Sequence, residues 1–294
     1  MSGKNRLSNY FKPYLFLLPA LCFVGLFLVY PAVNTFVISF AQWNGISKPL
    51  WIGLGNFANM VQDPAFWVAF KNTVFWVVGS LLIPVLLGLI AALLISMLPG
   101  ERVLKVMLFL PYALSGVVIA IMWSYMYSLH GAFNAILKLV GLGQIVKPWL
   151  QTVPANTLAM IITYGWRMTG TNMVLFSIGM QAIPEEPLEA AYIEGASSWQ
   201  TMTKVILPMM ASTTAVVVVM AIINGLNAFD IVWVMTQGGP YRSSATLAVN
   251  MYREAFVVFK FGLGAANAAV LSLLVLGAAV FYLRVIFRRT KIGE

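Results

Sequence analysis

Long apolar segments alternate with short polar ones along the chain, and this pattern predicts six membrane-spanning helices. Each segment is long enough to cross a bilayer, which takes roughly 20 apolar residues in a helix. The predicted spans are residues 14–40, 67–97, 103–127, 156–180, 209–235 and 264–287. Glycine, proline and asparagine residues interrupt the pattern between several of them, as expected for turns. We therefore expect an all-α membrane protein with six transmembrane helices.

Composition supports a membrane protein rather than a soluble one. Hydrophobic residues make up 61% of the 294 residues and charged residues only 9%, with a mean hydropathy of +0.87. A soluble domain carries about 25% charged residues. A transmembrane β-barrel would show alternating segments of about ten residues instead of these continuous apolar runs. The chain is therefore predicted to be a single transmembrane domain, residues 14–287, flanked by tails at 1–13 and 288–294.

The basic residues predict how the spans are oriented. The formal net charge is +9, and lysine and arginine cluster beside the apolar spans, which disfavours a nucleic-acid role. With both termini inside, ten basic residues lie inside and seven outside, and seven of the ten are near the two ends of the chain. We expect both tails to be cytoplasmic. This orientation also places the polar stretch 181–208 in the cytoplasm.

Several kinds of chemistry are excluded by what the sequence contains. Cys22 and His130 are the only cysteine and the only histidine, so neither an intrachain disulfide nor a zinc cluster is expected. No glycine-rich phosphate loop with its lysine is present, so a different chain must bind ATP if transport consumes it. We expect a non-catalytic subunit that binds no cofactor itself, with ATP and Mg²⁺ held by a partner ATPase.

The polar stretch from Pro184 to Pro208 predicts two short helices joined at a glycine. Acidic side chains near its start suit the N-terminus of a first helix, and Gly195 suits its end. Ser197 or Ser198 can cap a second helix, Trp199–Leu207, which Pro208 is expected to stop. A rigid, polar elbow of this kind is unusual in a chain that is otherwise mostly apolar.

Ionisable residues inside the predicted spans are candidates for a transport pathway, because such residues are costly in a bilayer. Arg167 lies in the fourth span and Asp230 in the fifth. Tyr164 shares a helix face with Arg167, as Asn224 does with Asn227, three residues on. Aromatic faces together with amide and guanidinium donors suit a sugar. The alternative is structural: Arg167 pairs with Asp230, and the asparagines bond neighbouring helices.

The elbow resembles a known signature. Glu189-Ala-Ala, then Gly195, then Val205-Ile-Leu-Pro208 is similar to the EAA motif of binding-protein-dependent ABC importer permeases, although that family usually has isoleucine at the position of Val205. The resemblance implies a type I (MetI-like) permease fold and a coupling helix that docks on the ATPase. The coupling residues it implies are Glu186, Glu189, Ala190, Ala191, Glu194, Gly195, Leu207 and Pro208.

Further motifs resemble the carbohydrate-uptake branch, akin to maltose- and glycerol-phosphate-type permeases. They include Phe109-Leu-Pro-Tyr112, Trp233-Val-Met-Thr-Gln-Gly-Gly-Pro240 and Tyr252-Arg-Glu-Ala-Phe256. The resemblance implies a sugar importer in a bacterial or archaeal plasma (inner) membrane, with a second homologous permease, an ATPase dimer and an extracytoplasmic solute-binding protein as partners. A permease for another small polar solute, or an ion-coupled secondary transporter, are the alternatives.

The same resemblance implies a substrate pathway at mid-membrane, built by the third, fourth and fifth spans. By matching motif flanks, it assigns the residues Tyr112, Gly116, Tyr164, Arg167, Met168, Gly225 and Asn227, to which Asn224 and Asp230 are added as polar residues of the fifth span. Met168 and Gly225 are poor hydrogen-bond donors through their side chains. It is therefore open whether this subunit or its partner holds the substrate.

Overall fold

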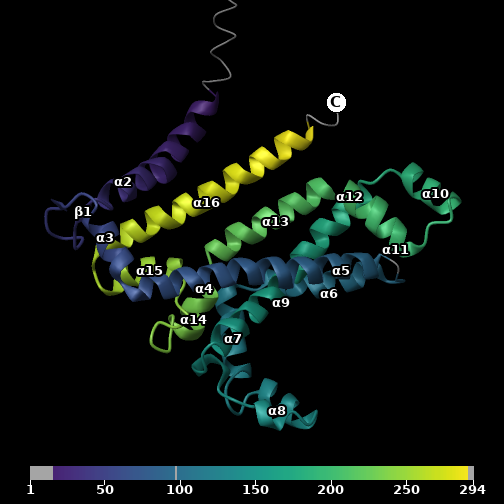
Figure 1. Cartoon of the computed structure of the whole chain (residues 1–294), viewed down its shortest axis with the longest axis horizontal. Coiled ribbons are helices and arrows are strands. Elements are labelled where there is room, and N and C mark those ends of the chain that lie inside the picture. The colour runs from purple at the N-terminus through teal and green to yellow at the C-terminus, as the bar shows by residue number, and fades with distance from the viewer. Residues whose placement is uncertain (1–15, 97, 291–294) are drawn as a thin grey trace, which may run out of the picture. The chain divides into compact units, whose positions relative to one another are not determined.

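The computed structural model describes residues 16–96 and 98–290, and most of these residues are helical (Figure 1). The predicted N-terminal tail, with Lys4, Arg6 and Lys12, lies outside the described residues. So do residues 291–294 of the predicted C-terminal tail, including Lys291. The cytoplasmic placement of both tails stays a prediction.

The helices and strands follow one another with few long connections. The first third of the chain contains η1 (Gly25–Val29), α2 (Tyr30–Ile38), β1 (Ala41–Gln42), β2 (Leu50–Trp51), α3 (Gly55–Gln62), α4 (Pro64–Ser80), η2 (Leu81–Val85) and α5 (Leu86–Ile95). The middle contains α6 (Glu101–Ala113), α7 (Gly116–Met126), α8 (Ala132–Leu139), η3 (Gly143–Ile145), η4 (Trp149–Gln151) and α9 (Ala155–Gln181). The last third contains α10 (Glu185–Ile193), α11 (Ser198–Thr201), η5 (Met202–Ile206), α12 (Leu207–Met209), α13 (Ala211–Leu226), α14 (Asp230–Thr236), α15 (Leu247–Tyr252), η6 (Arg253–Val257) and α16 (Phe261–Thr290).

Two compact units make up the described chain, and the smaller one combines residues up to 62 with residues 251–270. In this unit β1 and β2 form a short antiparallel hairpin, in which Ala41 lies opposite Trp51. The buried amide of Asn56 donates hydrogen bonds to the carbonyl oxygens of Ser39 (2.9 Å) and Ala41 (2.8 Å). These bonds fix the start of α3 to the end of the first long helix. The apolar pattern predicted only a loop here, because strands of two residues leave no periodic signal.

The larger unit is arranged around α9, which packs against α4, α5, α6 and α13. Small residues permit these close approaches, as is usual between helices in membranes. At Gly170 an added Cβ would lie 2.0 Å from the backbone oxygen of Leu108 in α6. A core of buried apolar residues fills the space between α5, α9 and α13; it consists of Val85, Ala92, Ile95, Met173, Phe176, Met210, Val217 and Ala221.

Four of the described helical segments are long and apolar enough to cross a bilayer: Phe16–Ile38, Pro64–Ile95, Ala211–Thr236 and Phe261–Tyr282. A fifth span results if α6 and α7 are taken together. Helix α9 has the length, with 27 residues, but is not among them, because its many polar and small residues lower its mean hydropathy. The predicted count of six spans is therefore not confirmed by length and hydropathy. The predicted positions of the long apolar helices agree with the structure.

The third predicted span, residues 103–127, is not the continuous helix that its apolar pattern suggested. Helix α6 ends at Ala113 and α7 starts at Gly116, with an angle of 93° between them. Leu114 and Ser115 are extended, with ψ angles of 144° and 140°, which breaks the helical hydrogen bonding. Pro111 also lacks the N–H that would continue the last turn of α6. The break brings the start of α7 next to α9 and α14, where the candidate pathway lies.

Candidate functional site

The first half of the elbow is helix α10, which starts with two exposed acidic residues, Glu185 and Glu186. It ends as predicted at Gly195, whose φ angle is +73°. The Gly195 N–H donates to the Tyr192 carbonyl (3.0 Å), and the Ala196 N–H donates to the Ala191 carbonyl (2.9 Å). This pair of bonds is the Schellman motif, which closes a helix with a left-handed residue. The sharp end of α10 therefore depends on the conformation that glycine adopts at lowest cost.

The second half of the elbow starts with a capping box. Ser197, rather than Ser198, is the N-cap: the Gln200 N–H donates to its hydroxyl (3.3 Å), and its own N–H donates to the Gln200 side chain (2.8 Å). Two otherwise unpaired backbone donors are satisfied in this way. The prediction that Pro208 stops this helix is wrong. The turns α11, η5 and α12 run on to Met209, because the wider turn of η5 accommodates the proline that lacks an N–H.

The side chains of the elbow divide into inward and outward groups. The predicted coupling residues Glu186, Glu189, Ala190, Glu194, Gly195 and Pro208 are exposed, whereas Ala191 is buried and Leu207 is half-buried. Sequence reasoning missed three large apolar side chains: Tyr192, Ile193 and Trp199 are 84%, 83% and 69% exposed. Their place among acidic residues on a short polar segment was the available signal. The elbow thus presents a mixed apolar and acidic surface, the composition expected of a protein contact.

A cluster of polar residues surrounds Gly116, the first residue of α7. A Cβ at Gly116 would lie 3.3 Å from Nη1 of Arg167 in α9 and 3.5 Å from Oδ2 of Asp230 in α14. The guanidinium of Arg167 also lies over the ring of Tyr112 in α6, 5.6 Å from its centroid. The structure therefore brings together four of the predicted pathway residues, from α6, α7, α9 and α14.

Arg167 and Asp230 approach one another without forming a contact ion pair. No ion pair within 4.0 Å joins these two described residues, in contrast to pairs such as Lys105–Glu101 and Arg242–Asp63. Nε of Arg167 is buried and has no hydrogen-bond partner there. Asp230 is exposed within this chain. The structural bridge that the sequence left open as an alternative is therefore not formed in this conformation.

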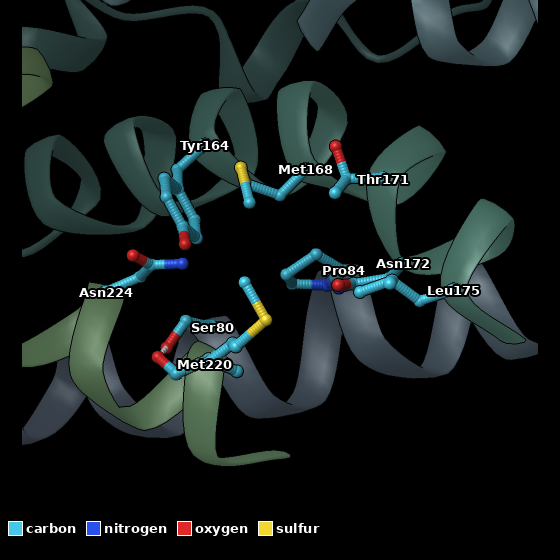
Figure 2. A pocket seen from close by; sticks show the side chains of 10 residues that line it. Ser80, Pro84, Tyr164, Met168, Thr171, Asn172, Leu175, Met220 and Asn224 are labelled. Atoms are coloured by element: carbon cyan, nitrogen blue, oxygen red, sulfur yellow. Dashed lines mark hydrogen bonds between the residues drawn. The ribbon is translucent and has the colours of Figure 1, made fainter. Parts of the chain in front are cut away.

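Three further predicted pathway residues line a small hollow between α4, α9 and α13 (Figure 2). Tyr164 and Asn224 point toward one another across it, with Met168 beside them. Its volume is about 10 Å³, close to the least space that holds one water molecule, so it does not accommodate a sugar. Sequence reasoning missed the lining residues Ser80, Pro84, Thr171, Asn172, Leu175, Met220 and Ala221, some of them from a span to which no role had been assigned.

The last two predicted pathway residues lie apart from both groups. Gly225 packs against α4, where an added Cβ would be 2.6 Å from the Ser80 hydroxyl oxygen and 2.7 Å from the Val77 Cα. Asn227 is exposed, and its amide donates to the Ile223 carbonyl of its own helix (3.0 Å). In this conformation Gly225 is a packing residue and Asn227 closes the end of α13.

A larger cavity of about 720 Å³ lies beside the start of α4 and α9, where no site was predicted. Its lining is mostly apolar and includes Lys71 and Lys147, whose ammonium groups lie over the rings of Phe75 and Trp149. No group of three potential metal ligands occurs among residues 16–96 and 98–290.

Most of the chain matches the model of one protein family. Residues 84–292 match the model of the binding-protein-dependent transport system inner membrane component. The matched region contains the elbow and every residue of the cluster around Gly116.

Individual relatives cover nearly the whole chain. A probable ABC transporter permease protein of Pyrococcus horikoshii is 34% identical over 275 residues, which are 92% of this chain and 93% of the relative. The trehalose/maltose transport system permease protein of Thermococcus litoralis is 32% identical over 278 residues, 92% of each chain. A chain from the crystal structure of a bacterial alginate ABC transporter, in complex with its alginate pentasaccharide-bound periplasmic protein, has a TM-score of 0.84 at 21% identity and covers 98% of both chains. The fold is therefore that of an ABC importer permease.

Proposed function

We propose that this chain, which belongs to the family of binding-protein-dependent transport system inner membrane components, is a sugar-conducting permease subunit of an ATP-driven importer. The observation that carries the proposal is the elbow 184–208, a polar segment of two capped helices that is exposed on the surface of a chain of long apolar helices. The trehalose/maltose permease relative supports a sugar as the solute. The chain itself performs no chemistry and conducts the solute.

The elbow is proposed to receive force from a separate ATPase. Its two helices are fixed at their junction by the Schellman motif at Gly195 and by the capping box at Ser197. Such a junction moves as a rigid body rather than unfolding under load. The exposed Tyr192, Ile193 and Trp199 would supply the apolar part of the contact, and the exposed glutamates its polar rim. Movement of the elbow would then change which side of the membrane the spans open to.

The proposed assembly contains two permeases, two ATPase copies and an extracytoplasmic solute-binding protein. Both chain termini are proposed to be cytoplasmic, which places the elbow on the side where ATP is available, in a bacterial or archaeal plasma membrane. The single permease domain is proposed to be residues 14–287. ATP and Mg²⁺ would be bound by the ATPase and not by this chain.

The cluster of Tyr112, Gly116, Arg167 and Asp230 is proposed as this subunit's part of the solute pathway. Asp230 and Tyr112 are exposed within the chain, so a second permease placed against this face would enclose them in a shared channel. The hollow at Tyr164, Met168 and Asn224 is too small for a sugar in this conformation and would have to open during transport. Gly225 and Asn227 would contribute only if α13 moved.

The test is to purify the complex that assembles with this chain, reconstitute it in proteoliposomes and measure the uptake of a panel of radiolabelled sugars. We expect uptake to require ATP on the side of the membrane that carries the ATPase. It should also require the solute-binding protein on the opposite side. Uptake that survives removal of ATP and stops when ion gradients are collapsed would instead identify an ion-coupled secondary transporter. Uptake of a polar solute other than a sugar would retain the ATP-driven mechanism and contradict the proposed substrate class.

A further inference from the structure

The two charged side chains beside Gly116 face the same small volume. Nη1 of Arg167 and Oδ2 of Asp230 both lie within 3.5 Å of the point where a Cβ of residue 116 would be, yet they form no ion pair within 4.0 Å. They come from α9 and α14, two helices that pack on each other and on α7. Gly116 places no side chain of its own between the two charged groups, and the space between them is called the gap below. The geometry is that of an opposite pair of charges held apart around a gap.

A gap between opposite charges treats neutral and anionic solutes differently. A hydroxyl group can donate to the Asp230 carboxylate and accept from the Arg167 guanidinium, and both bonds are of the strong, charge-assisted kind. An anionic group at the same place is attracted by Arg167 but repelled by Asp230 from a similar distance. Its interaction with the pair therefore largely cancels, while the cost of removing it from water remains.

We propose that Arg167 and Asp230 together select electrically neutral, hydroxyl-rich solutes, and that Asp230 is the residue that rejects sugar phosphates and uronates. This inference rests on the proposed function as a sugar permease and adds the charge class of its solute. Arg167 taken by itself would favour an anionic solute. The tertiary structure changes that expectation by placing a carboxylate beside the same gap.

The surroundings of Arg167 strengthen the case for a solute site. Its Nε is buried without a hydrogen-bond partner in the described chain, a state that is costly unless a ligand or water satisfies it. The ring of Tyr112 lies beneath its guanidinium plane and holds it in position. Tyr112 is 40% exposed, so its ring can also contact the apolar face of a sugar. Arginine does not lose its charge in a protein, so the pair cannot be neutralised on that side.

The experiment measures binding to the purified permease–ATPase complex. The solute-binding protein is left out so that its own preference among solutes does not affect the result. The probes are the neutral disaccharides trehalose and maltose and the anion trehalose 6-phosphate, each followed by equilibrium dialysis. We expect the native complex to prefer the neutral probes by about 10-fold or more, because placing like charges side by side is strongly unfavourable. Asp230→Asn should remove most of this preference by improving phosphate binding, while Asp230→Glu should retain it.

The matched control is Asp63→Asn, which removes a carboxylate paired with Arg242 outside the cluster. Asp63 caps α4, and asparagine is an equally good N-cap, so the helix start is preserved. This control should leave the preference unchanged. Equal binding of both probes by the native complex, or an unchanged preference in a normally assembled Asp230→Asn complex, would overturn the inference and leave the sugar permease intact. If neither probe bound and no sugar were transported, the proposed function would fail together with the inference.

Discussion

Replacing Gly195 tests whether the elbow works as an ordered element. The residue has a φ of +73°, and an added Cβ would meet no atom within 4 Å. A substitution there therefore causes no clash, and its cost is that of the left-handed backbone alone. That cost is about 1–2 kcal/mol for an L-residue, with asparagine below alanine and a β-branched residue above it.

The magnitude follows from the local equilibrium between the closed and the frayed end of α10. A loss of about 1–2 kcal/mol shifts this equilibrium by roughly 5- to 30-fold toward fraying. The two Schellman bonds, from Gly195 and Ala196, would be lost together with the fixed angle of the elbow. We expect solute transported per ATP hydrolysed to fall in the order Gly195→Asn, Gly195→Ala, Gly195→Val, with the valine variant the most impaired.

The assay is uptake and ATP hydrolysis measured side by side in proteoliposomes that contain equal amounts of assembled complex. Gly100→Ala is the matched control, because Gly100 also has a left-handed φ, +82°, with no atom within 4 Å of an added Cβ. It lies in the turn before α6 and outside the elbow. A Gly195→Val complex that transports as much solute per ATP as the native one would refute the reasoning. An equal loss in Gly100→Ala would attribute the effect to general destabilisation of the protein.

Three other variants test the remaining parts of the structure. Gly116→Leu should fill the gap between the charged groups and reduce uptake by about 10-fold or more without preventing assembly, measured as initial uptake rate; native uptake would exclude this gap from the pathway. Gly170→Ala should lower the thermal stability of the complex by the equivalent of about 1–3 kcal/mol, because its Cβ would lie 2.0 Å from a backbone oxygen, whereas Gly25→Ala, with nothing within 4 Å, should not; equal melting temperatures would contradict the packing argument. The double variant Tyr192→Ser with Trp199→Ser should reduce retention of the ATPase on the purified permease, a loss that truncation of contact residues at about 1–2 kcal/mol each would produce; full retention would place the contact elsewhere.

The elbow is the part of the site that could be read most fully from the chain. Its helix end at Gly195 and its serine cap are local features, and local features depend on residues a few positions apart. The expectation for Pro208 failed because the sequence does not reveal whether a proline ends a helix or is absorbed by a wider turn. The exposure of Tyr192 and Trp199 was equally beyond a local reading, since it depends on what packs against the elbow.

For the pathway residues, the sequence predicted less and the tertiary structure decided more. Arg167 and Asp230 were identified as costly residues inside apolar spans, but whether they paired was open. The answer depends on the break after Ala113, which turns α7 by 93° and sets Gly116 between them. Gly225 and Asn227 have the residue types and spacing of pathway groups, yet packing turns one toward α4 and bonds the other to its own helix.

By itself, the sequence determined that this is a helical membrane protein with a polar elbow, because hydropathy and helix capping depend on residues that are close together in the chain. Only the tertiary structure decided that Arg167 and Asp230 face one gap without pairing. These two residues are 63 positions apart in the sequence. The tertiary structure also decided that the third apolar segment bends and that the hollow at Tyr164 is nearly closed. The reason is physical: these properties depend on distances between helices, which are set by how side chains fill space and not by their order along the chain.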